Sequence, residues 1–345
     1  MSFFRLTIFF GKKVLYFRKS AVPLPPVEPP KPTNGAQIGG SFFYMSKVNF
    51  SKVCQTPAQL VALLKARGLS IKDDAKASSY LTSIGYFRLS AYFYPLLEAP
   101  KTNHKYKVGS SFKQVMDMYR FDRKLRLFVF NEIEKIEVAI RSQIASLGSL
   151  TLNNVFWLTD QANFANIKQF QITKDAIDKE IASSKEDFIL HFKDSYIEPY
   201  PPAWMITEII PFGTLSHIYT NIQDYSLKKR IAQHFGLQVP AFSSWLIVLG
   251  GLRNMCCHHA RMWNRELPIV PTEPKKMIHP WIDPTKTDKR RMYYRLCMVK
   301  YLLFTISPNN TFKEKLQNLL AEYPSIDITA MGFPSRWESE PLWSI

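Results

Sequence analysis

The segment from Ser111 to Leu147 contains neither proline nor glycine. Apolar side chains recur along it every three or four residues, at Val115, Tyr119, Leu125, Phe128, Ile133, Ile136, Ile140, Ile144 and Leu147. This spacing is that of one face of an α-helix, whereas a strand would alternate with a period of two. The segment therefore predicts one long helix, or two helices end to end.

Helical patterns continue on both sides of this segment. Thr56 and Gln59 have the spacing of a capping box, and Pro57 between them suits the first position of a helix. A short extended or hairpin piece is expected near Lys105–Val108. Further helices are predicted at about 161–183, 185–195, 202–222, 226–235, 240–264, 288–306 and 311–322. Few runs alternate apolar and polar residues, so the predicted fold class is all-α.

The chain is predicted to have four regions. Residues 1–44 hold clustered prolines and glycines without a periodic apolar face, which is typical of a disordered leader. We also consider the hypothesis that Met45 is the biological start and that the leader is mis-annotated. The rest divides into an N-terminal helical region at 45–110, a helical core at 111–265 and a C-terminal helical extension at 266–345.

The charge balance indicates an anionic partner. Forty-five lysines and arginines face 28 acidic residues, which gives a net charge of +17. Such a chain attracts polyanions such as nucleic acid by counterion release, although a merely basic protein without such a partner is the alternative. Four unevenly spaced cysteines make a disulfide framework improbable and favour a reducing cytoplasm. No apolar run reaches the roughly 20 residues of a membrane span, so no membrane is expected.

The predicted helix from Trp245 to Arg265 separates into two faces at 100° per residue. One face is apolar and is expected in the core: Trp245, Val248, Leu249, Leu252, Met255, Cys256, His259 and Trp263. The opposite arc is polar and basic: Gly250, Arg253, Asn254, Cys257, His258, Arg261, Asn264 and Arg265. Gly250 would permit the close approach of a partner helix. His259 is expected to be a core histidine, and Arg261 and Asn264 to support the polar arc.

Arg253, Asn254 and His258 are the predicted catalytic residues. Histidine can move protons near neutral pH, arginine can stabilise charge on a phosphoryl group, and asparagine can orient the histidine or bind phosphate. These groups suit transesterification of RNA, in which the 2′-hydroxyl is the nucleophile and no metal or other cofactor is needed. Arg253 and His258 lie about 140° apart on a helix, so two chains related by a two-fold axis would share the cleft.

Two other interpretations of these residues need to be considered. An Arg-x4-His spacing alone also fits a surface histidine beside a solvated basic face. A zinc site at Cys256-Cys257-His258-His259 is improbable, because four consecutive helical residues point in four directions and cannot enclose one tetrahedral ion.

Other polar residues are candidates for supporting roles. Glu137 and Arg141 are four apart and could buttress the site, although an ion pair within the helix is the simpler interpretation. Glu208 is a further candidate for supporting the catalytic residues through an intervening residue. Two basic clusters could contact RNA, and a solvated helix face is the alternative for each: Arg120, Arg123, Lys124 and Arg126 in the first, and Lys289, Arg290 and Arg291, with Lys286 and Arg295 nearby, in the second.

Six short sequence segments, which occur in the same order, resemble the Abi-like abortive-infection family of bacteria. Within that family the resemblance is to the AbiD/AbiF group. The segments are Leu64–Leu69, Ile84–Tyr92, Tyr119–Arg126, Pro201–Met205, Phe212–Leu215 and Leu252–Arg265. The resemblance runs from about Ser46 to Trp337. One departure is Cys257, where the family pattern leads us to expect alanine. Residues 1–44 have no counterpart in that pattern.

This resemblance implies a fold and a function. The family is similar to the HEPN superfamily of helical ribonucleases, whose Arg-polar-x3-His motif falls here on Arg253, Asn254 and His258. It implies an HEPN-like bundle, a phage-defence or toxin-like endoribonuclease, a homodimer, and association with a small structured non-coding RNA. The competing hypothesis is a non-catalytic RNA-binding protein of a defence or regulatory ribonucleoprotein. A DNA-binding regulator is disfavoured because no pair of recognition helices is readable.

Overall fold

Helix α4 (Phe112–Leu152) is the element on which most other helices pack. It belongs to a computed structural model that describes residues 53–344. At 1.5 Å per residue its 41 residues extend for about 60 Å. Ser111 and Gln114 form a capping box at its start. The predicted long helix is therefore confirmed as one continuous element, and it runs past Gly148.

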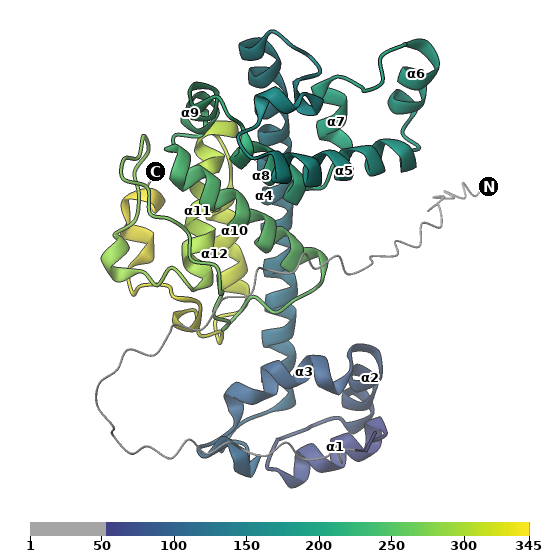
Figure 1. The fold of residues 1–345 in the computed structure, drawn as a ribbon. Coiled ribbons are helices and arrows are strands. Elements are labelled where there is room, and N and C mark those ends of the chain that lie inside the picture. The colour runs from purple at the N-terminus through teal and green to yellow at the C-terminus, as the bar shows by residue number, and fades with distance from the viewer. Residues whose placement is uncertain (1–52, 345) are drawn as a thin grey trace, which may run out of the picture. The chain divides into compact units, whose positions relative to one another are not determined.

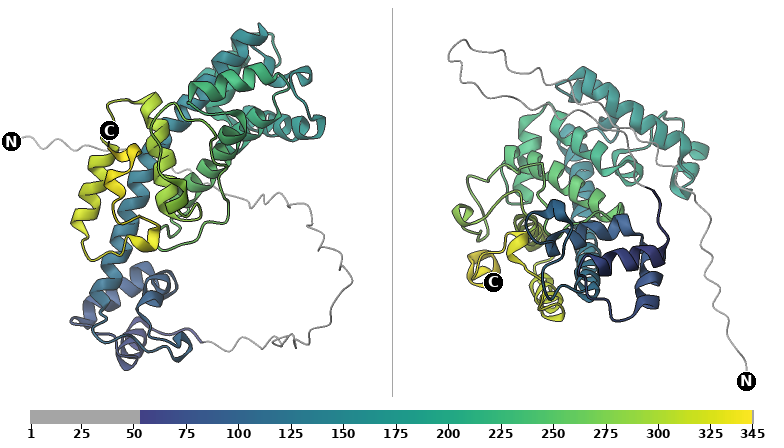
Figure 2. Two further views of the ribbon diagram at one scale, coloured as in Figure 1. Left: turned by 90° about the vertical axis from the view of Figure 1, so that its left-hand side faces the viewer. Right: turned by 90° about the horizontal axis from the view of Figure 1, so that it is seen from below.

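The remaining helices lie along α4 in three groups (Figure 1). The first group surrounds its N-terminal end and comprises α1 (Pro57–Ala66), α2 (Asp74–Ile84) and α3 (Tyr86–Phe93). The second lies toward its C-terminal end and comprises α5 (Ile167–Ser183), α6 (Asp187–Ser195) and α7 (Ala203–Ile209). The third comprises α8 (Phe212–Asn221), α9 (Tyr225–His234), α10 (Val239–Cys257), α11 (Met292–Ile306) and α12 (Phe312–Glu322). Figure 2 shows α10, α11 and α12 beside α4 from two further sides.

The all-α fold class is confirmed. Twelve α-helices and no β-strand occur within residues 53–344, where extended pairing is limited to isolated bridges such as Leu97 with Tyr106. The hairpin expected near Lys105–Val108 is reduced to that bridge. The described residues from Cys54 onward belong to one compact unit, and the region boundaries at 110 and 265 stay predictions. The leader at 1–44 and the Met45 hypothesis lie outside the described residues.

The helices of residues 53–344 were compared with the length and hydropathy of a membrane-spanning helix. None of them has by itself both the length and the apolar composition that crossing a membrane requires. Helices α9 and α10 pass that test only when taken together, and they meet at a bend of 65°.

Two predicted helices differ from the structure. The helix expected over 202–222 is broken into α7 and α8 at Ile210 and Pro211, because proline disfavours helical geometry at the preceding residue, and Ile210 has an extended ψ of 148°. The helix expected over 240–264 ends at Cys257. His259 adopts a left-handed φ of 55°, and the N–H groups of His259 and Ala260 donate to the carbonyls of Cys256 and Met255. This is the Schellman pattern that closes a helix, with histidine where glycine is usual.

Gly148 allows α4 to pass a buried tryptophan. A Cβ atom added at Gly148 would lie 2.3 Å from the ring of Trp157, which is fully buried. Real Cβ atoms do not approach other atoms so closely, so the glycine is needed for this packing.

We predict that Gly148→Ala destabilises the fold. Alanine improves helix propensity by about 1 kcal/mol, but overpacking against Trp157 costs about 2–3 kcal/mol and leaves a net loss of about 1–2 kcal/mol in the free energy of unfolding. Urea unfolding measures it. The control is Gly213→Ala in α8, where a Cβ meets nothing within 4 Å and stability should rise. A Gly148→Ala variant as stable as the wild type would contradict the prediction.

Candidate functional site

The candidate site is at the C-terminal end of α10. Asn254 lies in the last turn, and His258 is the capping residue, whose backbone N–H donates to the Asn254 carbonyl over 2.9 Å. Both residues are exposed, whereas Arg253 is half-buried. Gly250, one turn earlier, lies against α8, because a Cβ there would be 3.6 Å from the Phe212 ring. The expected opening toward a partner helix is therefore occupied by α8 at this position.

Arg253 is held by a carboxylate of α4. Its Nε atom lies 3.5 Å from Oε2 of Glu137. Oε1 of the same carboxylate accepts a hydrogen bond from Nη2 of Arg141, and Nη1 of Arg141 donates to the carbonyl oxygens of Thr207 and Ile210 at the end of α7. Glu137 and Arg141 are buried. Both interpretations of this pair are thus realised: it is an ion pair within α4, and it also braces Arg253.

This arrangement sets the direction of Arg253. Arg141 neutralises Glu137 and is itself fixed by two carbonyl oxygens, so the carboxylate has one preferred position. Arg253 Nε is buried and makes no hydrogen bond to any residue that the structure describes, so its contact with Glu137 is electrostatic. The side chain is 36% exposed, which leaves part of the guanidinium accessible to an anion beside Asn254.

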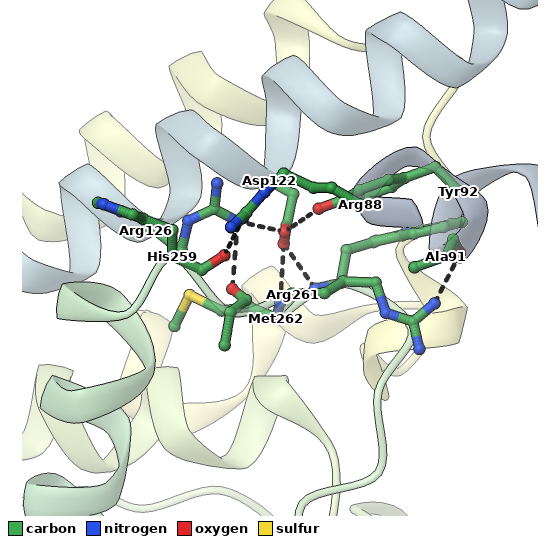
Figure 3. Close-up of polar contacts among 10 residues, drawn as sticks. Arg88, Ala91, Tyr92, Asp122, Arg126, His259, Arg261 and Met262 are labelled. Carbon is green, nitrogen blue, oxygen red and sulfur yellow. Dashed lines mark hydrogen bonds and ion pairs between the residues drawn. The ribbon is translucent and has the colours of Figure 1, made fainter. Parts of the chain in front are cut away.

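The chain that follows His258 is attached to α4 by Asp122 (Figure 3). Oδ1 of this carboxylate accepts hydrogen bonds from the backbone N–H groups of Met262 (3.0 Å) and Trp263 (2.7 Å). Oδ2 accepts from the Tyr92 hydroxyl (2.6 Å) and from Nη1 of Arg126 (2.5 Å). We call Asp122, Tyr92, Arg126 and the two N–H groups the Asp122 anchor.

Burial and pairing act on Asp122 in opposite directions. The side chain is fully buried, and burial raises the pKa of its carboxyl. The hydrogen bond from Tyr92, the charge of Arg126 and the backbone N–H groups of Trp263 and Met262 oppose this rise. Two partners on each oxygen, one of them cationic, are what a buried carboxylate needs to remain ionised. The same burial, with Asp122 nearby, raises the pKa of the Tyr92 hydroxyl, so Tyr92 remains a donor.

Three arginines complete the attachment of the loop. Arg88 of α3 donates to the His259 carbonyl (2.8 Å), and Arg126 donates to the Ala260 carbonyl (3.2 Å). In the other direction, Arg261 of the loop donates to the Ala91 carbonyl of α3 (2.8 Å). Figure 3 shows these contacts converging from α3, α4 and the loop. The segment from His259 to Trp263 is therefore tied to both helices at nearly every residue.

The structure corrects two predictions about side chains. His259 is not a core histidine: it is exposed, because the helix has already ended and its left-handed backbone turns away from the apolar stripe. Arg126 does not lie on a basic face that could track RNA. It is 5% exposed and its guanidinium is occupied by Asp122 and Ala260.

The other supporting candidates are dispersed. Asn264 has a left-handed φ of 46° and lies beyond the loop, so it does not share a helix face with Asn254. Glu208 is exposed on α7. Cys256 is buried, which raises its pKa to about 12, whereas Cys257 is exposed. The four residues of the Cys-Cys-His-His run thus do not share one environment.

Most residues of the two basic clusters are paired with acids or hydroxyls. In the first, Arg120 contacts Tyr80 and Asp117, Lys124 contacts Glu322, and Arg123 is exposed. In the second, Lys289 pairs with Glu273, Arg290 with Glu266 and Arg291 with Asp288. Arg295, expected nearby, is buried in α11. These pairs reduce the local positive charge, and RNA contact by either cluster stays a prediction.

Sequence reasoning missed Asp122, Tyr92 and Arg88. The four-residue spacing of Asp122 and Arg126 was a readable signal of an ion pair within the helix. The partners of that pair in the loop were not readable, because they are backbone N–H groups 140 and 141 positions away.

We predict that Asp122→Asn destabilises the fold by about 3–5 kcal/mol, because it leaves Arg126 as an uncompensated buried charge. Chemical denaturation measures the loss. The matched control on the same helix is Asp117→Asn, which removes ion pairs with two exposed residues, Lys113 and Arg120, and should cost less than about 1 kcal/mol. Equal effects of the two substitutions would show that the anchor contributes no more than a surface pair.

Comparison with known proteins identifies the family. Residues 79–264 match the family model of the Abi-like proteins. This stretch is more than half of the 345-residue chain, and it includes the Asp122 anchor, Glu137, Arg253 and His258. Searches of the curated proteins and of the solved structures each gave no match. The chain therefore belongs to the Abi-like protein family.

Proposed function

We propose that this protein is a phage-defence endoribonuclease that cleaves RNA by transesterification at Arg253, Asn254 and His258. Family membership indicates a role in abortive infection. The endoribonuclease activity, the HEPN superfamily and the AbiD/AbiF group are the finer parts of the proposal. The observation that carries it is the brace on Arg253: a buried Glu137–Arg141 pair orients an arginine beside two exposed polar residues at the end of the same helix.

His258 is the proton-transfer group of the proposed reaction. As a base it takes the proton of an RNA 2′-hydroxyl, and the 2′-oxygen then forms a bond to the adjacent phosphorus. The bond from phosphorus to the 5′-oxygen breaks, and that oxygen receives a proton from an acid, which is His258 of a second copy in the shared cleft. The products are a 2′,3′-cyclic phosphate and a 5′-hydroxyl. The ribose supplies the nucleophile, so these steps need no metal.

Arg253 stabilises the negative charge that develops on the phosphoryl oxygens. Glu137 keeps the guanidinium from extending freely into solvent. This reduces the conformational entropy that the Arg253 side chain loses when the phosphate binds. Asn254, exposed beside Arg253, is placed to donate to a phosphate oxygen or to orient His258.

The placement of the residues on α10 supports the proposed homodimer. Arg253 is turned toward α4, whereas positions 254 and 258 lie on the exposed side of the helix end. Ile247 is seven residues before Asn254 and shares its face, and Ile247 is 49% exposed. Val138, next to Glu137 on α4, is 54% exposed. These apolar groups border the site and support a second copy as the partner that completes it.

RNA is the proposed substrate, a small structured non-coding RNA a proposed partner, and the cytoplasm the proposed location. The net charge of +17 supports an RNA partner.

The direct test is RNA digestion by the purified full chain in a metal chelator. We expect His258→Ala to lower the cleavage rate about 10²- to 10⁴-fold and Arg253→Ala about 10²- to 10³-fold, because each removes a group that acts on the reacting phosphate. The control is His217→Ala, which removes an exposed histidine of α8 and should leave the rate unchanged.

Analysis of the RNA products decides between a ribonuclease and a non-catalytic RNA-binding protein. A 2′,3′-cyclic phosphate that disappears in His258→Ala supports the ribonuclease. If the wild type binds RNA in a salt-sensitive manner that Arg253→Ala weakens, yet forms no cyclic phosphate even when phage infection is reproduced in cells, the protein is an RNA-binding module and the catalytic proposal is wrong.

We further predict that Glu137→Gln separates RNA binding from cleavage. Loss of the carboxylate removes a negative charge beside the phosphate site and releases Arg253. RNA affinity should therefore stay the same or rise, while the cleavage rate falls about tenfold or more. Binding by fluorescence anisotropy and single-turnover cleavage measure the two effects. The substitution also leaves the buried Arg141 without its acid and lowers stability, so both assays are run at a temperature at which the variant is folded. The control is Glu134→Gln, an exposed position one turn earlier on α4. A parallel fall of binding and cleavage would indicate general damage to the fold instead of a positioning role.

A further inference from the structure

A cavity of about 180 Å³ lies between α10, α11 and the loop that joins them. Its walls are mostly apolar, and two arginines complete the lining: Val248, Leu252, Met255, Ile269, Arg265 and Arg295 are among its residues. No acidic residue of the part of the chain that the structure describes lines it. The cavity lies on a different side of α10 from Arg253, so it is separate from the proposed ribonuclease site.

Arg295 is the unusual member of this lining. It is 2% exposed, and it lies in α11, a helix that is buried around its whole circumference from Met292 to Leu303. One guanidinium nitrogen, Nη2, donates to the Ile269 carbonyl. The other, Nη1, is buried and has no hydrogen-bond partner among the described residues. A planar group with five N–H donors is thus only partly satisfied.

The charge of Arg295 is also only partly compensated. Burial lowers its pKa to about 10, with Tyr294 and Asp288 opposing the change, and a guanidinium with that pKa is still charged at neutral pH. Asp288 forms its ion pair with Arg291. Buried charges in proteins are normally paired, because removal from water is costly unless an opposite charge replaces the hydration. A ligand anion would supply what the chain does not once a small turn of the side chain presents the guanidinium to the cavity, because Nη1 itself is closed to solvent.

The size and composition of the cavity define the rest of the ligand. A volume of about 180 Å³ is close to that of an engineered cavity of roughly 150 Å³ that holds one benzene ring. Apolar walls favour an apolar body over an inorganic ion. Arg265 is exposed and adds a second positive charge to the lining, which would attract the same anion from solution.

We propose that this cavity binds a small organic anion, with a ring-sized apolar body against α10 and a carboxylate or phosphate monoester on Arg295. Binding pairs the buried guanidinium and stabilises the contact between α10 and α11. This site does not depend on the ribonuclease proposal, and its test contains no RNA.

The test measures thermal unfolding and calorimetric binding of the full chain with two probes, benzoate and phenyl phosphate. We expect at least one of them to raise Tm by about 2 °C or more at saturation. Benzyl alcohol and benzylamine carry the ring without the negative charge, and inorganic phosphate carries the charge without the ring, so none of the three should do so. Binding of benzoate alone or of phenyl phosphate alone identifies which acid group the site accepts.

Two variants locate the binding. Arg295→Met keeps an unbranched side chain in place of the arginine stem, removes the charge and should weaken binding at least about tenfold. Gly251→Leu keeps Arg295 but fills the cavity, which Gly251 also lines. Its Cβ has only the Ile269 side chain nearby, at 3.9 Å, so the helix tolerates it while the probe is excluded. The proposal is overturned if neither anion binds at about 10 mM, if inorganic phosphate binds equally well, or if the folded Gly251→Leu variant retains full affinity.

Discussion

The buried carboxylate of Asp122 is the interaction on which the region around the candidate site depends. It lies on the longest helix, yet two of its four donors belong to a loop far along the chain, after α10. Each charge-assisted hydrogen bond contributes about 1.5–3 kcal/mol, and together they offset the cost of removing the carboxylate from water. Because Tyr92 comes from α3, one side chain joins three segments that the sequence separates.

A second carboxylate on the same helix fixes the other part of the site. Glu137 lies fifteen residues after Asp122, or about 22 Å along α4, and it contacts Arg253. Helix α10 and its following loop are thus held at two points of one rigid element. The helical geometry of α10 sets where His258 lies relative to Arg253, and the two contacts with α4 fix the orientation of that helix end. Helix α4 therefore positions both α10 and the loop after it, although the candidate catalytic residues lie on α10 and not on α4.

Helix α10 also separates two environments that differ in charge compensation. Toward α4, Arg253 faces a carboxylate that Arg141 already neutralises. Toward α11, Arg295 has a backbone carbonyl as its hydrogen-bond partner and a cavity beside it. An arginine near a shared carboxylate is oriented but still partly available to phosphate, whereas a deeply buried and incompletely paired arginine is the group to which we assign a ligand anion.

The sequence by itself determined the helical class, the helical character of the segment from Ser111 to Leu147 and the capping box at Thr56, because these follow from the spacing of nearby residues. It also predicted that Glu137 and Arg141 would pair, since they are one turn apart. Tertiary structure decided where α10 ends and which side chains surround its end. His259 was expected in the core, but the Schellman turn, with Arg88 bonded to the His259 carbonyl, placed it at the surface. The four-residue spacing from Asp122 distinguished Arg126 from its exposed neighbour Arg123, but only the fold brought the loop carbonyl to Arg126. Local patterns encode hydrogen bonds within a helix, whereas partners more than a hundred residues apart are chosen by the packing of the whole chain.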